Sequence, residues 1–527
     1  MRSILILTVI LLVQFTVAAE SRFQKLFGDT LADNLVEILK TYDGGYLMAG
    51  NIDLNDQSPD RCDVGLYFTN RFGDLSYSLR IGDNQRNVLK GAYQHANHAL
   101  TIYGVTYGSP NDASHTEIFV VQLDEFGTPL WSSCFGTYGD DQVGGLYGYP
   151  DGSCVVVGKS AADGSALIFK IDNIGHLSWS HVLTVTGFES FFNSITPTMD
   201  GYFIVAGGVL KDSVISGNST YPRYNDLLAK FDLNGDLVWS KTYGTTPGSF
   251  ISNSVAFDPA GGFIVTGSYS QTASSAADVQ LFKLDPSGNE QWRWEYQKAD
   301  HETPNGLLLL PSNKIAIVGN ITQGGDQQGF ILVTDSTGHL DYDYHYGTGS
   351  AYDIIDGIDG GIAIAGSSDQ YTSSLDGHML KTDVSGITGC NETAVNFTSG
   401  IPAVSHAATL EGHATPVFLN EDYLTFLTTT YANQFGQLCS FIGVNEQQFS
   451  ASFSIFPNPG SESISINNPL PEKINGEILD ANGRILENFA LTSLSNTKIP
   501  TNQLSAGMYT VRIFNDTFQQ HLRWIKQ

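Results

Sequence analysis

Short apolar runs bounded by glycine and aspartate recur along the whole first part of the chain. Each run of β-branched and aromatic residues ends in glycine, as in residues 46–50, 203–207, 263–267 and 362–366. Runs of this length and composition predict strands rather than helices. Their nearly continuous apolarity indicates that both faces of each strand are covered, as in an inner strand of stacked sheets.

A second element, an Asp-x-x-Gly turn often followed by Leu-x-Trp or Leu-x-Tyr, repeats at a similar spacing. Its copies lie at residues 70–73 (with Asn in place of Asp), 124–127, 172–175, 232–235, 285–288, 335–338 and 383–386. Subtracting successive first residues gives 54, 48, 60, 53, 50 and 48, a period typical of propeller blades. With the strands that flank this turn, each unit is predicted to be a four-stranded sheet.

The two ends of the repeat region predict how the ring closes. Residues 23–28 match the outermost strand of a later unit, 239–244, but precede any inner strand, and the seventh unit lacks that strand because Gly386 runs into Gly389 and Cys390. We therefore predict an all-β chain whose residues 20–390 form a seven-bladed β-propeller closed by its N-terminal strand, which would remove exposed sheet edges. An open solenoid is the alternative.

The N-terminal segment, residues 1–19, has the composition of a secretory signal peptide. Arg2 precedes an uncharged apolar stretch from Ile4 to Val17, which ends in the small residues Ala18 and Ala19. An uncleaved anchor is the alternative. No later apolar run is long enough to cross a bilayer, so we expect no transmembrane span.

The charge of the chain narrows the classes of partner. It has 26 Lys and Arg against 54 Asp and Glu, a net charge of −28, and the residues after Phe453 are balanced, so the excess lies before that point. Such a field repels phosphate backbones and anionic lipid, which argues against nucleic-acid and membrane-surface partners. Solubility outside the cell explains the acidity better than cation binding.

Five cysteines leave at least one unpaired or bonded between chains. Cys390 and Cys439 bracket a segment outside the repeats, and we predict a disulfide between them, which a secreted setting permits. Cys154 occupies the position of Phe203 and Phe263 in other units and is predicted to be a buried free thiol. No Cys or His spacing suggests a metal site, and no cofactor is predicted.

Residues 453–527 carry a separate set of motifs. In order, these are Pro457-Asn458-Pro459, then Asp480 with Gly483 and Arg484, then Gly507 with Tyr509, and a final apolar, basic strand. This segment resembles the C-terminal sorting domain of the type IX secretion system, in its type A form. The resemblance implies an Ig-like β-sandwich recognised by that secretion machinery. It also implies export to the outer surface of a Gram-negative cell, followed by tail removal and attachment to lipopolysaccharide.

The residues between ring and tail are less regular. We expect strands within 391–445 that pack on the side or base of the ring, and a linker at 446–452.

Blade topology places the loops after the second strands and the loops between blades on one face, where ligand residues are predicted. The candidates are Tyr107, Tyr221, Arg223, Tyr224, Tyr269 and Tyr371. Tyrosines on a polar rim suit sugars or peptides, although ordinary loop tyrosines are the simpler explanation. We predict a monomeric binding or adhesion module for a glycan or protein ligand.

An extracellular propeller glycosidase or polysaccharide lyase is the alternative function. No nucleophile elbow, zinc motif or phosphate-binding loop occurs. The repeated Asp-x-x-Gly turn resembles the Asp-box of sialidases with one extra residue, but a residue repeated in every blade is architectural. Carboxylates about 5–10 Å apart in the central channel would favour the enzyme.

Overall fold

The computed structural model describes residues 21–526, and its gaps leave out several of the segments predicted above. The gaps are residues 30, 54–61, 84, 109–113, 186–187, 217–218, 246, 273–274, 299–300, 371–373, 401–407, 411–412, 425, 431–433, 442–452, 469–472, 481–483 and 516–518. The predicted signal segment 1–19, the linker 446–452, Tyr371 and Gly483 therefore lie outside the described residues. No helix in the described part is long and apolar enough to cross a membrane.

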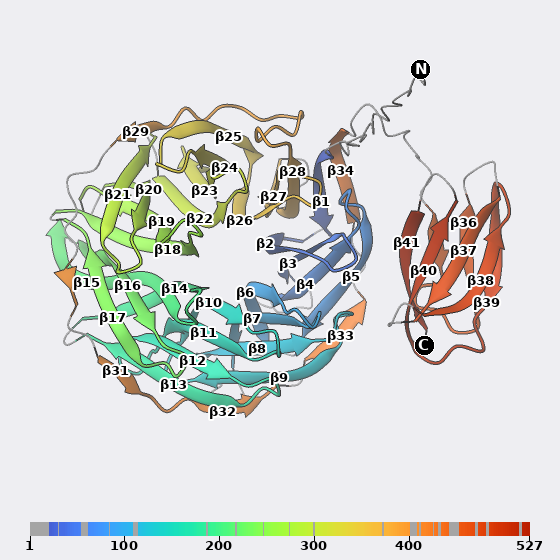
Figure 1. Ribbon diagram of the computed structural model, residues 1–527, viewed down its shortest axis with the longest axis horizontal. Helices are drawn as coiled ribbons and strands as arrows, with labels where there is room; N and C mark the ends of the chain where they lie inside the picture. The colour runs from blue at the N-terminus through green and yellow to red at the C-terminus, as the bar shows by residue number, and fades with distance from the viewer. Residues whose placement is uncertain are drawn as a thin grey trace, which may run out of the picture.

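Seven antiparallel sheets surround a central axis as the blades of a propeller (Figure 1). Blades 1 to 3 are β2 (Asp33–Lys40), β3 (Tyr46–Asp53), β4 (Cys62–Thr69), β5 (Leu75–Gly82); β6 (Arg86–Gln94), β7 (Leu100–Tyr107), β8 (Thr116–Leu123), β9 (Pro129–Gly136); and β10 (Gln142–Gly148), β11 (Cys154–Lys159), β12 (Ala166–Ile171), β13 (Leu177–Thr184). Blades 4 to 6 are β14 (Ser190–Pro197), β15 (Phe203–Ser216), β16 (Ser219–Phe231), β17 (Leu237–Tyr243); β18 (Ser249–Phe257), β19 (Phe263–Ser270), β20 (Ala277–Leu284), β21 (Glu290–Gln297); and β22 (His301–Leu309), β23 (Ile315–Gln323), β24 (Asp326–Thr334), β25 (Leu340–Thr348).

Blade 7 combines the two ends of the repeat region. It contains β26 (Ser350–Asp356), β27 (Ile362–Ser368) and β28 (Asp376–Thr382), and its fourth strand is β1 (Arg22–Gly28). β1 pairs antiparallel with β28 and places Phe23 opposite Lys381 and Leu26 opposite His378. The seven-bladed propeller closed by its N-terminal strand is therefore confirmed.

The repeated turn is an interlocking device between blades. The Asp172 carboxylate accepts the N–H groups of Ile174 (3.0 Å) and His176 (2.9 Å), which closes the turn. Gly175 follows with φ +93°, and a Cβ there would lie 2.8 Å from the ring of Trp131 in the preceding blade. Glycine satisfies both the left-handed backbone and the close approach of the indole.

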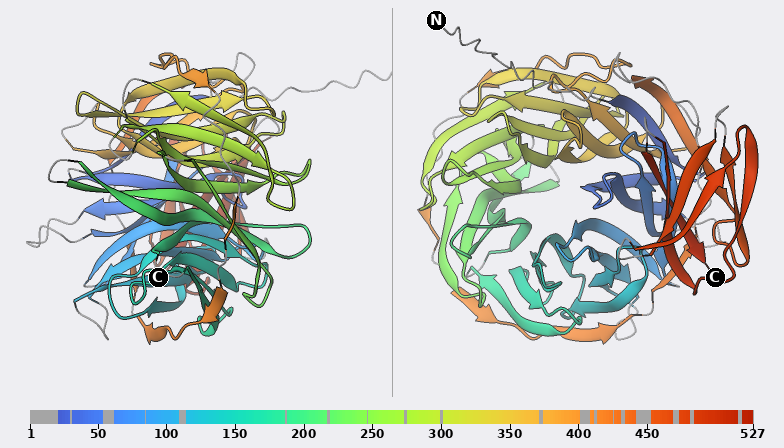
Figure 2. Two further views of the ribbon diagram at one scale, coloured as in Figure 1. Left: turned by 90° about the vertical axis from the view of Figure 1, so that its left-hand side faces the viewer. Right: turned by 45° about the vertical axis from the view of Figure 1, so that its right-hand side comes forward.

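A single segment then runs around the outside of the ring; we call residues 390–441 the belt. Thr393 bridges His345 of blade 6, and short belt strands then add a fifth strand to blades 5, 4, 3, 2, 1 and 7 in that order. These strands are β29 (Thr398–Gly400), β30 (Ala408–Thr409), β31 (His413–Pro416), β32 (Asn420–Tyr423), β33 (Leu427–Thr430) and β34 (Gln434–Phe441). Figures 1 and 2 show the belt along the outer edge of the ring, in orange and brown.

The two ends of the belt meet at blade 7. Cys390 and Cys439 form a disulfide with Cα atoms 6.1 Å apart, and Cys439 lies in β34 opposite Gln24 of β1. The disulfide therefore closes the belt upon itself around the propeller. Cys154 is a buried free thiol, as predicted, and Cys62 and Cys134 are also free and buried.

The C-terminal residues form a separate domain of two sheets around one apolar core. One sheet has the order β35 (Ser454–Phe456), β36 (Ser463–Asn468), β39 (Ser495–Pro500); the other has β38 (Ile485–Leu491), β37 (Ile474–Leu479), β40 (Gly507–Phe514), β41 (Gln519–Lys526). Ile466, Ile478, Val511 and Trp524 are fully buried between them. The predicted β-sandwich is confirmed.

The Pro-Asn-Pro motif of this domain holds its last strand in place. The Asn458 side-chain amide donates to the carbonyl of Arg523 (2.9 Å), and the N–H of Ile525 donates to the Asn458 amide oxygen (2.9 Å). The Trp524 indole donates to the carbonyl of Pro457 (3.1 Å). The motif thus fixes the backbone on both sides of Trp524.

Two further motif positions close local loops. Asp480 accepts the N–H of Arg484 (2.9 Å) and pairs with its guanidinium. The Tyr509 hydroxyl donates to the carbonyl of Ser505 (2.8 Å), just before Gly507 opens β40.

Candidate binding face and central channel

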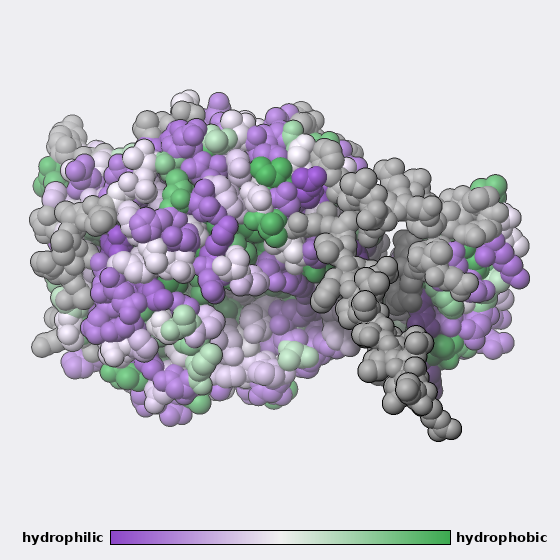
Figure 3. Space-filling model, turned by 45° about the horizontal axis from the view of Figure 1, so that its top comes forward, coloured by the Kyte–Doolittle hydropathy of each residue, from purple (hydrophilic) through white to green (hydrophobic). Residues whose placement is uncertain are grey.

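The two faces of the ring differ in what their connections contain. We call the face with the tight Asp-Gly turns the turn face, and the face with the loops after the second strands and between blades the hairpin face. In the view of Figure 3, apolar residues lie scattered among hydrophilic ones.

Tyr221, Arg223 and Tyr224 of blade 4 were predicted to lie on the loop after the second strand, but they lie on a protruding hairpin. β15 has 14 residues and β16 has 13 residues, more than any other strand of the ring. They pair from Phe203 with Phe231 out to Ser216 with Ser219. The loop prediction is wrong here because Val209, Val214 and Ile215 favour extended backbone.

Arg223 stabilises this hairpin from within. Its guanidinium forms a two-point ion pair with Asp212 on the opposite strand and donates to the carbonyl of Pro247 (3.0 Å). A ligand would therefore meet Arg223 as part of an ion pair rather than as a free cation.

The predicted tyrosines occupy different environments. Tyr107 is 40% exposed, with the Arg86 guanidinium 4.8 Å from its ring centre. Tyr221 is half-buried on the hairpin, and Tyr224 packs edge-on against Phe191 at its base, with ring centres 5.6 Å apart.

Tyr269 does not fit the expected exposed rim. It is only 7% exposed and stacks on Phe250 of the neighbouring strand, with ring centres 4.8 Å apart. The neighbouring aromatic buries it, so its ring offers no open surface to a ligand.

A cavity of about 560 Å³ lies on the hairpin face at blade 3, and no repeat or motif in the chain predicted it. Three connections meet there, and the lining residues are Asp140, Lys159, Ala161, Asp163, Gly164, Ser165, Thr184, Val185, Phe188 and Glu189. Phe188 is 45% exposed. A phenylalanine in the connection between two blades was the one available clue.

Local hydrogen bonds fix the carboxylates of this cavity. Asp140 accepts the N–H of Thr116 (2.9 Å), Asp163 accepts the N–H of Ser165 (3.1 Å), and Glu189 pairs with the Lys159 ammonium. The cavity thus combines an aromatic ring with preorganised acceptors, the groups that recognise sugar hydroxyls and C–H faces. The Leu210 N–H donates to the Glu189 carbonyl (2.7 Å), which ties the cavity to the base of the hairpin.

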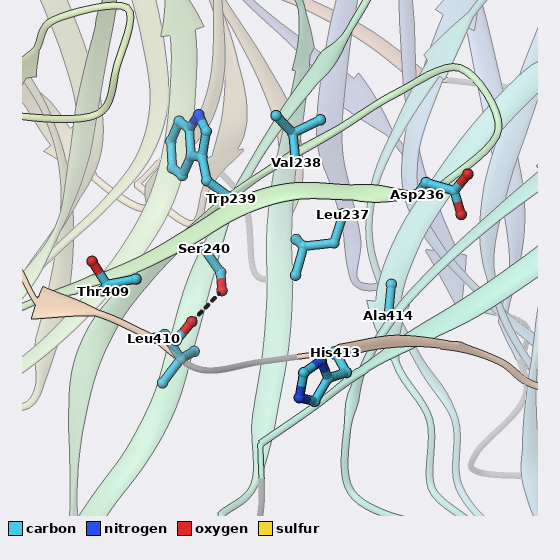
Figure 4. Close-up of a pocket in the computed structure, with 9 residues that line it drawn as sticks. All are labelled: Asp236, Leu237, Val238, Trp239, Ser240, Thr409, Leu410, His413 and Ala414. Atoms are coloured by element: carbon cyan, nitrogen blue, oxygen red, sulfur yellow. Dashed lines mark hydrogen bonds between the residues drawn. The ribbon is translucent and has the colours of Figure 1, made fainter.

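A second cavity, of about 520 Å³, lies where the belt crosses from blade 4 to blade 3 (Figure 4). Its lining comes from residues 236–240 of blade 4 and from Thr409, Leu410, His413 and Ala414 of the belt. The Ser240 hydroxyl donates to the Leu410 carbonyl (2.9 Å) beside it. This cavity is a consequence of the crossing belt and brings together no pair of carboxylates.

The inner strands of all seven blades carry a β-bulge at the same place. In blades 4 to 6 the extra residue is asparagine, and its side-chain amide donates to the next blade. Asn193 reaches the Ser252 carbonyl (3.0 Å), Asn253 reaches Pro304 (2.7 Å) and Asn305 reaches Ala351 (2.8 Å). This half of the channel is lined by repeat-related structural side chains.

The other half of the channel holds a carboxyl pair. Asp353 of blade 7 accepts the N–H of Ile38 (2.9 Å) and a hydrogen bond from the Glu37 carboxyl of blade 1. Burial raises the pKa of Asp353 to about 6, and burial together with the Asp353 charge raises the pKa of Glu37 well above its ordinary value. Glu37 therefore keeps its proton and donates a hydrogen bond to the Asp353 carboxylate.

Lys90 of blade 2 lies near this pair, and burial lowers its pKa while the Glu37 charge opposes that shift.

Two carboxyls in direct hydrogen-bond contact leave no room for the sugar and water that glycosidases hold between carboxyls about 5–10 Å apart. Among the described residues, no group of three or more His, Cys, Asp or Glu is placed to hold a metal ion.

Comparison with known proteins identifies the tail. Residues 454–527 match the family model described as the secretion system C-terminal sorting domain. None of the curated protein sequences matches the chain.

Among solved structures, the chain is similar to Sqt1 of Chaetomium thermophilum (10% identity, TM-score 0.36, covering 67% of this chain and 96% of that one). It is also similar to the α-L-arabinanase of Penicillium chrysogenum solved with arabinobiose (11% identity, TM-score 0.36, covering 61% and 100%). TM-scores this low carry no argument about function.

Proposed function

We propose that this chain is a secreted or surface-displayed binding module, exported through its C-terminal sorting domain, that holds a glycan or protein ligand on the hairpin face. The observation that supports it best is the cavity at blade 3, with Phe188 and fixed carboxylates beside the protruding hairpin of blade 4. Tyr221 and Tyr224 lie on that hairpin, in β16.

A neutral glycan suits this site better than an anionic one. The net charge of −28 repels polyanions, while carboxylates accept hydrogen bonds from sugar hydroxyls and a phenyl ring packs on a sugar face. One propeller supplies the whole site, and we expect the protein to act as a monomer.

A glycan array probed with the chain from residue 20 onward tests this function. We expect binding to neutral glycans that Phe188→Ala abolishes and that Tyr221→Ala with Tyr224→Ala weakens. Ile174→Ala, which removes a side chain 61% exposed on the turn face, is the matched control and should leave binding unchanged. Binding that survives both hairpin-face changes would place the site elsewhere.

The enzymatic alternative predicts that the protein cleaves a bound polysaccharide and releases shorter sugars, whereas a binding module holds the polysaccharide intact. Incubation of the same protein with each bound polysaccharide should release no shorter sugar if the function is binding alone. Oligosaccharide release that persists in Phe188→Ala but stops in Asp353→Asn would instead assign a glycosidase or lyase to the channel.

Export and surface attachment follow from the tail. Deletion of residues 453–527 should retain the protein in the periplasm while the ring still folds, because the domain has its own core. Surface display of the truncated chain at the full-length level would remove the sorting role.

A further inference from the structure

Arg523 of the last strand of the sorting domain reaches out of its own domain to blade 1. Its guanidinium pairs with the Asp43 carboxylate (2.8 Å) and donates to the Tyr77 hydroxyl (2.7 Å). Its central carbon lies 5.7 Å from the ring centres of both Tyr77 and Phe68. The Arg523 side chain is only 17% exposed, so the contact encloses it.

The other blades show what normally stands opposite this aspartate. Asp43 lies in the turn between the first two strands, and the equivalent residues are Asp200 in blade 4 and Asp359 in blade 7. Each pairs with a lysine on the third strand of its own blade, Lys230 (2.9 Å) and Lys381 (3.1 Å).

Blade 5 makes the same kind of pair with an aspartate two positions earlier in the turn. There Lys283 pairs with Asp258 of the same turn (2.6 Å). The third-strand lysine is therefore a recurrent partner of this turn.

Blade 1 lacks that lysine. Phe68 stands at its position, since it lies opposite Tyr77 in β5 as Lys230 lies opposite Trp239 in β17. Arg523 therefore supplies, from another domain, the cation that blades 4, 5 and 7 supply from their own strands.

Tyr77 departs from the repeat as well. In other blades the aromatic at its position lies over the turn glycine of the next blade: Trp131 over Gly175, Trp179 over Gly235, Trp239 over Gly288. The next turn glycine after blade 1, Gly127, meets Leu79 instead. Tyr77 stacks on Phe68, with ring centres 4.4 Å apart and planes within 10°.

The surroundings favour a bound guanidinium. Stacked aromatic faces and a carboxylate are the partners that arginine prefers. Burial raises the pKa of Tyr77, so its hydroxyl stays neutral and accepts the guanidinium N–H. The Glu125 carboxylate of the neighbouring blade adds attraction to Arg523.

We propose that Asp43, Phe68 and Tyr77 form a guanidinium-binding site on blade 1 that holds the sorting domain against the ring through Arg523. Asn458 of the Pro-Asn-Pro motif fixes the carbonyl of Arg523, so the motif presents the docking side chain from a rigid strand. This site is independent of the ligand site on the hairpin face.

Small-angle X-ray scattering of the chain from residue 20 to 527 tests the docking. Arg523→Gln and Asp43→Asn each remove one partner, and Phe68→Lys restores the lysine of other blades so that it competes for Asp43. All three should raise the radius of gyration and the maximum dimension. Arg484→Gln, which removes an arginine 76% exposed in the same domain, is the matched control and should scatter as the unmodified chain does.

Circular-dichroism melting of each variant shows whether it is folded, so that an expansion caused by lost docking is distinguished from one caused by unfolding. The double variant Asp43→Asn with Arg523→Gln should expand no more than either single variant, because both remove the same contact. Scattering of Arg523→Gln that overlays the unmodified chain overturns the proposal, as does an equal expansion in Arg484→Gln.

Discussion

The hairpin face and the turn face arise from the same seven repeats, but some of their carboxyl groups differ in the direction of their pKa shifts. On the turn face, hydrogen bonds from the Thr198 hydroxyl and from Lys230 lower the pKa of Asp200, and hydrogen bonds from Ser153 lower that of Asp151. On the hairpin face, burial raises the pKa of Asp33 to about 7 and that of Glu295 to about 7.

This difference shows which carboxyl groups stabilise the fold in their ionised form and which do not. Asp151 and Asp200 of the turn face accept hydrogen bonds from the turns in which they lie, so they support the architecture. Asp33 and Glu295 of the hairpin face are buried, and burial disfavours their ionisation, whereas the hydrogen bond from Arg223 lowers the pKa of Asp212 on the same face. Perturbed pKa values of this kind occur at functional surfaces and in structural ion-pair networks alike.

Removal of the belt disulfide should have the largest effect and should weaken both faces together. Cys390→Ser frees a loop with a sequence separation of 49 residues, and loop entropy values that constraint at about 4 kcal/mol. Urea denaturation of the variant should show one cooperative transition at lower denaturant. Buried Cys154→Ser is a control for loss of a thiol without loss of a crosslink. An unchanged midpoint in Cys390→Ser would mean that the disulfide contributes nothing to the stability of the ring.

Glycine-to-alanine changes should then separate the faces. Gly235 on the turn face has φ +83° and a Cβ there would lie 2.6 Å from Trp179, so Gly235→Ala should cost roughly 3 kcal/mol from strain and clash. Gly164 on the hairpin face has φ +68° with no atom nearer than 3.7 Å, so Gly164→Ala should cost only about 1 kcal/mol. Equal losses in thermal unfolding would contradict the contrast in packing.

The pH dependence should differ in direction between the faces. The folded pKa of Glu295 is about 7, above the unfolded value of about 4.3. The folded state therefore holds more protons between these values, and stability rises as pH falls from 7 towards about 4.3, by at most about 1.4 kcal/mol per pH unit.

Glu295→Gln should flatten this part of the stability profile, measured by urea unfolding at pH 7, 6 and 5. Asp200→Asn is the turn-face control. The pKa of Asp200 is lowered, so its contribution is lost only as pH falls below the ordinary aspartate range, and the slope between pH 7 and 5 should not change. A slope that Glu295→Gln leaves intact would assign the protons to other groups.

The smallest effect is expected for the turn-face ion pairs. Lys230→Gln removes the partner of Asp200, whose side chain is 55% exposed, and should cost less than about 1 kcal/mol. Ligand binding should be unaffected, since both residues lie on the turn face. A loss above about 2 kcal/mol would show that these pairs carry more of the architecture than their exposure suggests.

The ring could be predicted from the sequence because its pattern repeats. Each unit restates the same turn and inner strand, and residues 23–28 match the outer strand of a later unit in residue type alone. The belt strands could be anticipated only in outline. Ala408–Thr409 and Leu427–Thr430 carry little strand signal of their own and pair because the blades offer them an edge.

The candidate site depends on contacts between residues that are far apart in the sequence, and no local sequence pattern predicts such contacts. Tyr269 is buried because Phe250 of the adjacent strand stacks on it, and the blade 3 cavity exists because three separate connections converge around Phe188. Glu37 and Asp353 touch only because the ring closes. The positions that depart from the repeat could have indicated the proposed sites: Phe68 replaces a lysine in blade 1, and blade 4 has a long hairpin.

Amide hydrogen exchange of the full chain, with and without the tightest ligand from the array, tests the division of the two faces most directly. We expect the ligand to slow exchange in residues 159–165 and in β15 and β16, while the turns at 172–175 and 232–235 exchange as before. Protection of the turns with no change around Phe188 and the hairpin would contradict that division.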